Sequence, residues 1–242
     1  MSYGVAAVTR RNFTTYGLAL SGCLTTFAVT PPRKHLLIPQ LLSPLLRYMS
    51  DMMSLSEILQ VVHPVSPAVV RQLEQVATLR QYPRRSRLVT QDAKCESVFF
   101  ISDGLCRGLY EKEEKEDTRW FAAKGDVVTS PTAWHTGEAA IFSIEAITDM
   151  MVYEVPFDDM KELLARCSEL RDWEVKVLME QLYVLERRYV ILGTGDARSR
   201  YEALLNGRPQ EILNAIPLKY IAQYLKITQE TLSRVRKAYG RS

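Results

Sequence analysis

The stretch that decides the fold lies near the C-terminus, at residues 216–237, and reads IPLKYIAQYLKITQETLSRVRK. Its apolar residues recur at helical spacing on both sides of a short break; they are Ile221, Ala222, Leu225, Leu232 and Val235. Pro217 suits the first turn of the first helix, where a missing N–H is no loss. Thr228 is a natural N-cap for the second helix, because its hydroxyl can accept from the first-turn N–H groups. The stretch therefore predicts a helix-turn-helix.

The second of these helices carries the side-chain types that read DNA bases. Arginine can bind guanine through two hydrogen bonds, glutamine can bind adenine, and glutamate can accept from the amino group of cytosine. The residues expected to contact DNA are Gln229, Glu230, Thr231, Ser233, Arg234 and Lys237, together with Lys219 on the first helix. An ordinary solvated helical hairpin is the alternative. DNA binding is favoured because Glu230 is the only acidic residue from 216 onwards, among six basic ones.

Composition limits the remaining possibilities. The chain has 242 residues, enough for one large or two modest domains, and a net charge of only +3, so its basic character is local to the C-terminus. The four cysteines and three histidines show no metal-ligand spacing, so we expect no zinc and reduced thiols. We also find no nucleophile motif and no glycine-rich phosphate loop. The sequence therefore predicts no cofactor and no enzymatic activity.

Residues 1–50 differ from the rest and allow two interpretations. Arg10 and Arg11 precede a moderately apolar run, and residues 20–23 read LSGC, like a bacterial lipoprotein cleavage site. This would make the protein a membrane-anchored ligand sensor. The other interpretation is a disordered leader or an upstream start codon, since several prolines break the segment. DNA binding favours the second interpretation, because exported proteins do not normally bind chromosomal DNA.

The middle of the chain predicts two short helices followed by many short strands. The helices are expected at 55–59 and 66–76. The strands are expected at 88–89, 98–101, 105–110, 120–121, 127–128, 141–147 and 151–155. Such a series of short strands is typical of a barrel or jelly roll. The charged run 111–117 is expected to be a solvent-facing hairpin tip.

A short helix at 158–167 and a longer one at about 169–192 follow the strands. Apolar residues of the longer helix alternate spacings of three and four, and they are Val175, Leu178, Leu182, Leu185, Tyr189 and Leu192. This heptad seam favours pairing with a second copy of the chain. A single stripe can also be intramolecular core, which is the alternative. Gly193 and Gly195 end the helix and provide a hinge.

Taken together, these segments resemble the Crp–Fnr family of transcription regulators over about residues 54–238. The stretch 216–237 is similar to the family's helix-turn-helix, and VFFISDGLCRGLY at 98–110 is similar to the centre of its cyclic-nucleotide-binding β-roll. Gly125-Asp126 and residues 142–146 extend the match. The resemblance implies an α+β protein with a leader at 1–50, a jelly-roll-like β-roll sensor domain at 51–167, a dimerisation helix at 168–193 and a helix-turn-helix domain at 194–242.

The same resemblance implies a homodimeric, cytoplasmic transcription regulator that binds a pseudo-palindromic site in double-stranded DNA. Its two recognition helices would enter successive major grooves, about 34 Å apart. RNA polymerase is the implied protein partner, and the small-molecule effector is unknown. One departure from the family concerns the turn, where glycine is usual and Lys226 stands here.

A second departure concerns the effector pocket. Cyclic AMP binders carry Gly-Glu-Leu for the ribose and an arginine for the phosphate, and the corresponding positions here are residues 129–131, which read TSP, and Ala140. An anionic phosphate in a partly buried pocket needs a positive partner such as arginine. We therefore expect a degenerate pocket around Gly125, Asp126, Ser130 and Ala140, with weak or no binding of cyclic AMP.

Overall fold

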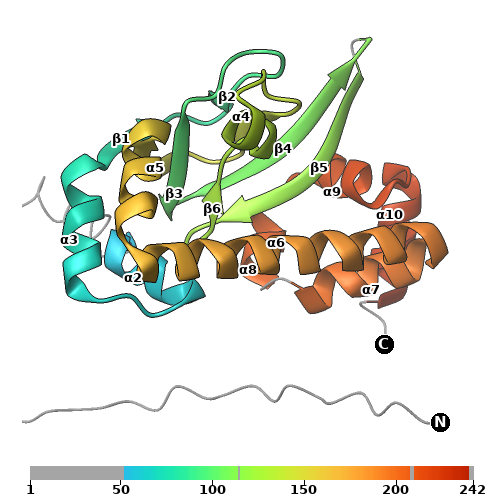
Figure 1. The fold of residues 1–242 in the computed structure, drawn as a ribbon. Helices are drawn as coiled ribbons and strands as arrows, with labels where there is room; N and C mark the ends of the chain where they lie inside the picture. Colours follow the sequence, from blue (N-terminus) through green and yellow to red (C-terminus); the bar gives the residue numbers. More distant parts are fainter. Residues whose placement is uncertain (1–51, 114, 208–209, 240–242) are drawn as a thin grey trace, which may run out of the picture.

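The structure is a computed structural model that describes residues 52–113, 115–207 and 210–239 (Figure 1). The leader at 1–50 lies outside the described residues. Two four-stranded antiparallel sheets form the β-roll, in the orders β1-β8-β3-β6 and β2-β7-β4-β5. The strands are β1 (Thr78–Tyr82), β2 (Arg87–Val89), β3 (Ser97–Asp103), β4 (Leu105–Lys112), β5 (Lys115–Ala123), β6 (Val127–Val128), β7 (Ser143–Ala146) and β8 (Met150–Pro156).

These strands confirm the expected β-roll within an α+β fold. Each predicted strand is present, with its ends shifted by a few residues. The strand β1 is additional, because the residues of its TLRQY segment are exposed or only half-buried and so show no alternation of buried and exposed positions. Strand β3 shows the opposite pattern, since its VFFI run is buried on both faces. A strand covered on both sides has no need for polar residues in alternate positions.

The helices of the described chain fall into two groups. They are α2 (Leu55–Val62), α3 (Pro67–Val76), α4 (Pro131–Thr136), α5 (Phe157–Arg166), α6 (Ser168–Thr194), α7 (Ala197–Gly207), α8 (Gln210–Ala215), α9 (Leu218–Leu225) and α10 (Gln229–Tyr239). The first five belong to the β-roll or leave it, and the last four form the C-terminal bundle (Figure 1). The six-residue α4 is too short to show a helical period in the sequence. None of the helices in the described ranges is both long and apolar enough to cross a membrane.

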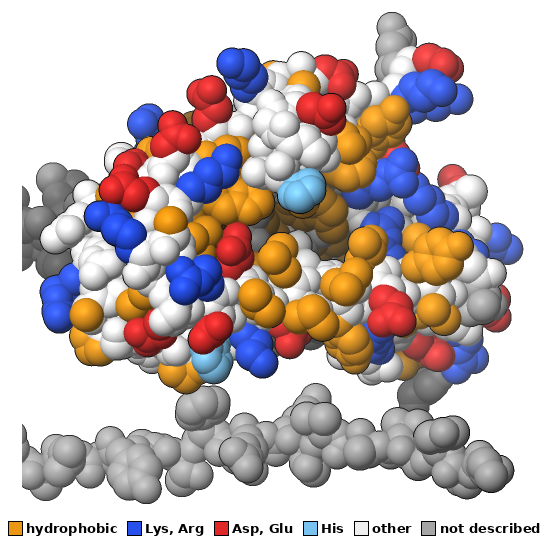
Figure 2. All heavy atoms as spheres, in the orientation of Figure 1, with side chains coloured by type: hydrophobic (Ala, Val, Ile, Leu, Met, Phe, Trp, Pro, Cys, Tyr) orange, Lys and Arg blue, Asp and Glu red, His pale blue; other side chains and the backbone are white. Residues whose placement is uncertain are grey.

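Helix α6 begins inside the core of the β-roll and then leaves it. Trp173 is 2% exposed, its ring stacks on Phe100 at 5.8 Å between centroids, and its indole N–H donates to the carbonyl of Leu59 at 2.9 Å. Beyond this anchor the apolar stripe is in solvent. Five of its six predicted members are 55–82% exposed, and these are Val175, Leu178, Leu182, Leu185 and Tyr189. Hydrophobic side chains gather along this helix in Figure 2. The alternative of an intramolecular core is therefore wrong for the stripe.

We expect Trp173→Ala to lower the free energy of unfolding by about 3–5 kcal/mol, because it leaves a large cavity beside Phe100 and frees the start of α6. Urea unfolding followed by circular dichroism measures this. Trp134→Ala is the control, since Trp134 is only half-buried and should cost clearly less. Equal small losses in both variants would contradict the role of Trp173 as an anchor.

Candidate nucleic-acid interface

Helices α9 and α10 form the predicted helix-turn-helix. The residues on their facing sides are buried as expected, with Ile221, Ala222, Leu225 and Leu232 inside and Val235 half-buried. The Thr228 hydroxyl accepts from the N–H of Thr231 at 3.1 Å, which caps the start of α10. Pro217 occupies the N-cap position of α9, one residue before the first turn in which the sequence places it. The packing leaves the opposite face of α10 free to meet a partner.

The turn between the two helices passes through Lys226 in the left-handed conformation, with φ 57° and ψ 44°. Its N–H closes the end of α9 on the carbonyls of Ala222 and Gln223. A residue with a side chain costs about 1 kcal/mol more than glycine in this conformation. The Lys226 ammonium forms an ion pair with Asp117 of β5, which offsets part of this cost. The turn thus keeps its left-handed shape despite the departure from glycine.

The residues predicted to contact DNA lie on the outer face of α10. Gln229, Glu230, Ser233, Arg234 and Lys237 are exposed, and Thr231 is half-buried. The Arg234 guanidinium donates to the Thr231 hydroxyl at 3.3 Å, which holds it over the helix surface. Hydrogen bonds from its own backbone N–H and from the Thr228 hydroxyl hold the pKa of Glu230 below its usual value, so this side chain is an ionised acceptor. Lys219 lies on α9, away from this row, with its ammonium 3.9 Å from Glu116.

The C-terminal bundle does not stand apart from the β-roll. A second hydrophobic core joins them, built from Leu105, Phe121, Ala123 and Ile147 of the roll and from Tyr201, Leu204, Leu213, Ile216, Ile221, Ala222, Leu225 and Leu232 of the bundle. Helix α9 lies against β5 (Figure 1), and the rings of Phe121 and Tyr224 meet at 5.3 Å between centroids. The position of α9 is therefore fixed by the sheet as well as by α10.

At the centre of this junction is Arg107, a buried arginine that the sequence does not single out. It comes from β4 and is 1% exposed. Its guanidinium donates to Glu145 at 2.9 Å, to Glu116 at 2.8 Å, to Thr118 at 3.1 Å and to Gln223 of α9 at 3.4 Å. The same group lies 3.7 Å from the centroid of the Tyr220 ring, also in α9. One side chain thus binds two sheet strands and one helix of the candidate interface.

The charges around Arg107 stabilise one another. Burial alone would lower the pKa of Arg107, but the bonds from Glu116 and Glu145 outweigh it and leave the pKa raised. The hydrogen bond from Arg107 in turn holds the pKa of Glu116 below its usual range. Both groups therefore keep their charges at neutral pH. A buried ion pair of this kind needs all its partners, because an unpaired buried charge is costly.

This junction corrects the expectation for the charged run 111–117. Lys112, Glu113 and Lys115 are exposed at the hairpin tip, as expected. Glu116 and Asp117 are not simply solvent-facing, because their carboxylates bind Arg107 and Lys226. The sequence hides this, since a run of charges looks the same whether it faces water or a neighbouring domain. The nearby Arg107 in an apolar strand was the available signal.

The residues expected in the degenerate effector pocket do not lie together. Gly125, with φ +90°, and Asp126 make the turn from β5 to β6, where the Asp126 carboxylate accepts from the N–H of Ala123 at 2.8 Å. Ala140 is fully buried and bonds through its backbone to Asp92 and Ala93. Of the four, only Ser130 lines a cavity. Within the described ranges no group of three or more histidines, cysteines or carboxylates could hold a metal ion.

The Glu116 contact predicts a dependence of stability on pH. Because the folded-state pKa lies below the model value of 4.5, Glu116 contributes stability above that pH and loses it as the pH falls through the folded-state value. Glu116→Gln should lower the free energy of unfolding at pH 7 by about 1 kcal/mol, a value reduced for the partial exposure of this side chain. The gap should close in acid. Urea unfolding at a series of pH values tests this.

The matched control is Glu113→Gln at the exposed hairpin tip, which should change stability little at any pH. A gap between the wild type and Glu116→Gln that stays constant from pH 7 into acid would contradict the ionic contact.

Comparisons with known proteins agree with this architecture. Residues 79–167 match the family model of the cyclic nucleotide-binding domain. No match was found among curated protein sequences. Among solved structures, FixK2 from Bradyrhizobium japonicum is 21% identical, with 69% of this chain and 85% of that chain covered and a TM-score of 0.61.

Two further structures share the fold. CooA from Carboxydothermus hydrogenoformans, as a double mutant, is 19% identical, with 78% of this chain and 86% of that chain covered and a TM-score of 0.59. A protein from Eubacterium rectale, titled as a transcriptional regulator of the Crp/Fnr family, is 12% identical, with coverage of 73% and 84% and a TM-score of 0.57. At these identities the likeness shows the fold. The chain therefore contains a domain of the cyclic nucleotide-binding family, set in the fold that regulators of the Crp/Fnr type share.

Proposed function

We propose that this chain is a homodimeric, sequence-specific DNA-binding transcription regulator of the Crp–Fnr type. The observation that carries the proposal is the outer face of α10, where base-reading side chains are exposed in a row while Leu232 anchors the helix from behind. A helix held in this way can enter a major groove without losing its packing. The proposed role is not catalytic, and it places the protein with chromosomal DNA in the cytoplasm, with RNA polymerase as its protein partner.

Each exposed side chain of α10 has a distinct proposed task. Arg234 binds guanine, and Glu230 accepts from a neighbouring cytosine. Gln229 stands where the family usually has arginine, so it shifts the first base read from guanine towards adenine. Lys237 meets a phosphate, which supplies affinity without sequence information. Lys219 serves the same purpose only if it turns away from Glu116.

The exposed stripe of α6 supports the homodimer. Its leucines and Tyr189 repeat with the heptad period and have no cover in the single chain. A second copy would remove this apolar surface from water through a twofold interface, in which each residue of the stripe is buried twice. The same twofold axis would place two copies of α10 on the two halves of a pseudo-palindromic site.

We expect Arg234→Ala to relax sequence preference at one position in each half-site, at about 1–3 kcal/mol each. Lys237→Ala should instead weaken binding to all sequences and make it less dependent on salt. Binding to a randomised DNA library at several salt concentrations separates the two effects. If Arg234→Ala weakens every sequence equally, Arg234 is a backbone contact and the placement of α10 is wrong.

For the dimer, Leu182→Lys and Leu185→Lys should each give monomers, because the new charge would be buried twice across the interface. Analytical ultracentrifugation reports the change. The matched control is Val184→Lys, the same kind of substitution at an exposed position off the heptad seam, which should leave the dimer intact. Dimers in both seam variants would refute the role of the stripe.

A further inference from the structure

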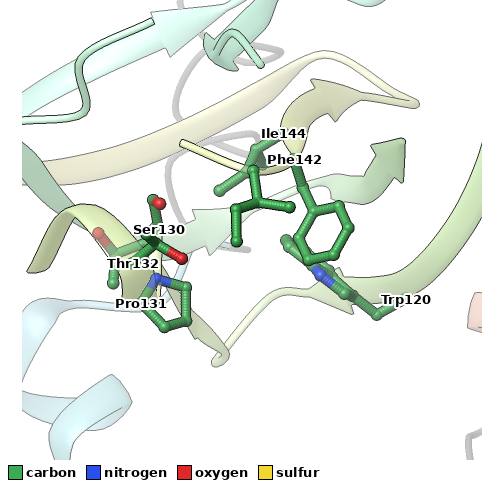
Figure 3. Close-up of a pocket in the computed structure, with 8 residues that line it drawn as sticks. Trp120, Ser130, Pro131, Thr132, Phe142 and Ile144 are labelled. Atoms are coloured by element: carbon green, nitrogen blue, oxygen red, sulfur yellow. The ribbon is translucent and has the colours of Figure 1, made fainter. Parts of the chain in front are cut away.

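A cavity of about 140 Å³ lies between the start of α4 and the strands β5 and β7, away from the candidate DNA interface (Figure 3). Eight residues line it, and they are Trp120, Thr129, Ser130, Pro131, Thr132, Ile141, Phe142 and Ile144. Figure 2 shows a hollow with hydrophobic walls on the face of the molecule between α4, β5 and α6. This space has no part in the contacts that hold α9 and α10.

The cavity depends on a glycine in the middle strand of three. Gly108 of β4 pairs with Trp120 on β5 and with Ile144 on β7, and both neighbours line the cavity. A Cβ atom at position 108 would lie 2.1 Å from a ring carbon of Trp120. The indole therefore lies over the bare backbone of Gly108. Any larger residue there would push the ring out of its place in the cavity wall.

The polar groups of the wall are already committed to the protein. The Ser130 hydroxyl accepts from the N–H of Ala133 at 3.3 Å and caps α4. The Thr129 hydroxyl donates to the carbonyl of Ser97 at 2.9 Å. Phe142 is held by an edge contact with Tyr110, at 6.1 Å between ring centroids. The groups left to face a ligand are therefore mostly aromatic rings and aliphatic carbons.

None of the eight lining residues is ionisable. A cyclic phosphate taken into such a place would lose its water without gaining a cation, which is costly. Arg107 lies next to Gly108 in β4, but Glu116, Glu145 and Gln223 already occupy its guanidinium. An anionic ligand therefore has no partner here, whereas a neutral apolar one would gain contact with Trp120 and Phe142.

The volume narrows the class further. An apolar protein cavity of about 150 Å³ holds one benzene molecule, and pockets for drug-sized ligands start at about 300 Å³. We propose that this cavity binds a small uncharged molecule with an apolar body of about one aromatic ring, and that it does not bind cyclic nucleotides. Such a ligand stacks on or beside the Trp120 indole. The inference concerns the β-roll alone, so its test needs no DNA.

The test compares toluene with benzoate, which adds only a negative charge to the same ring size, and with cyclic AMP, each added to the full chain. Toluene at ten times its dissociation constant should raise the melting temperature by about 3–6 °C. It should also change the tryptophan fluorescence, and the Trp120→Phe variant should lose that change although Trp134 and Trp173 remain. Benzoate and cyclic AMP at equal concentration should do neither.

Two variants locate the site, and one serves as control. Thr132→Phe should fill the cavity and abolish toluene binding, and Ile141→Glu should weaken it at least about tenfold by placing a charge in the wall. Ala139→Glu places the same charge two residues away on an exposed position outside the cavity and should bind toluene normally. Ile141 is 47% exposed, so its variant should fold.

The proposal is overturned if benzoate or cyclic AMP binds as tightly as toluene, or if toluene changes neither the melting temperature nor the Trp120 signal. It is also overturned if Thr132→Phe and Ile141→Glu both bind toluene as the wild type does.

Discussion

The buried guanidinium of Arg107 imposes the constraint on which the arrangement of the two halves depends. A cation removed from water must be matched by acceptors, and removing one partner of such a pair costs about 3–5 kcal/mol. Its acceptors come from β5, β7 and α9, so the charge is fully matched only when α9 lies against the sheet. Tyr220 covers the open face of the guanidinium and excludes water from the same spot. The position of the helix-turn-helix is thus part of the electrostatic balance of the β-roll.

Strand β5 connects this junction to the cavity. Trp120 and Phe121 are consecutive, and successive side chains of a strand point to opposite faces. Trp120 lies in the wall of the cavity, whereas Phe121 belongs to the second core and meets Tyr224 of α9. On the neighbouring strand, Arg107 and Gly108 divide the same way, with the charge towards α9 and the glycine beneath the Trp120 indole. A movement of Trp120 would therefore act on a backbone that also carries a contact to α9.

Much of the fold follows from local patterns, and much of the junction does not. The helix-turn-helix, the strands and the stripe of α6 could be predicted because burial repeats with period 3.6 or 2 in the sequence. Strand β1 and helix α4 lack such a repeat, the first through exposure and the second through its length. The contacts of Arg107 join residues up to 116 positions apart, and no local pattern records them. The cavity also escaped prediction, since only one of the four residues expected in it lines it, and Gly108 acts through an absent side chain.

The far end of α6 shows why pairing and DNA reading would be linked. Arg188, on this helix, lies 4.3 Å from the centroid of the Tyr224 ring. Arg200 of α7 donates to the carbonyls of Leu192 and Gly195 at the end of α6, and also to Leu225 at the end of α9. Carbonyls at helix ends have no partner within the helix, so one arginine here satisfies two helices and ties them together. If two copies pair along α6, as we propose, these contacts would transmit the geometry of the pair to α9, and through the shared core to α10.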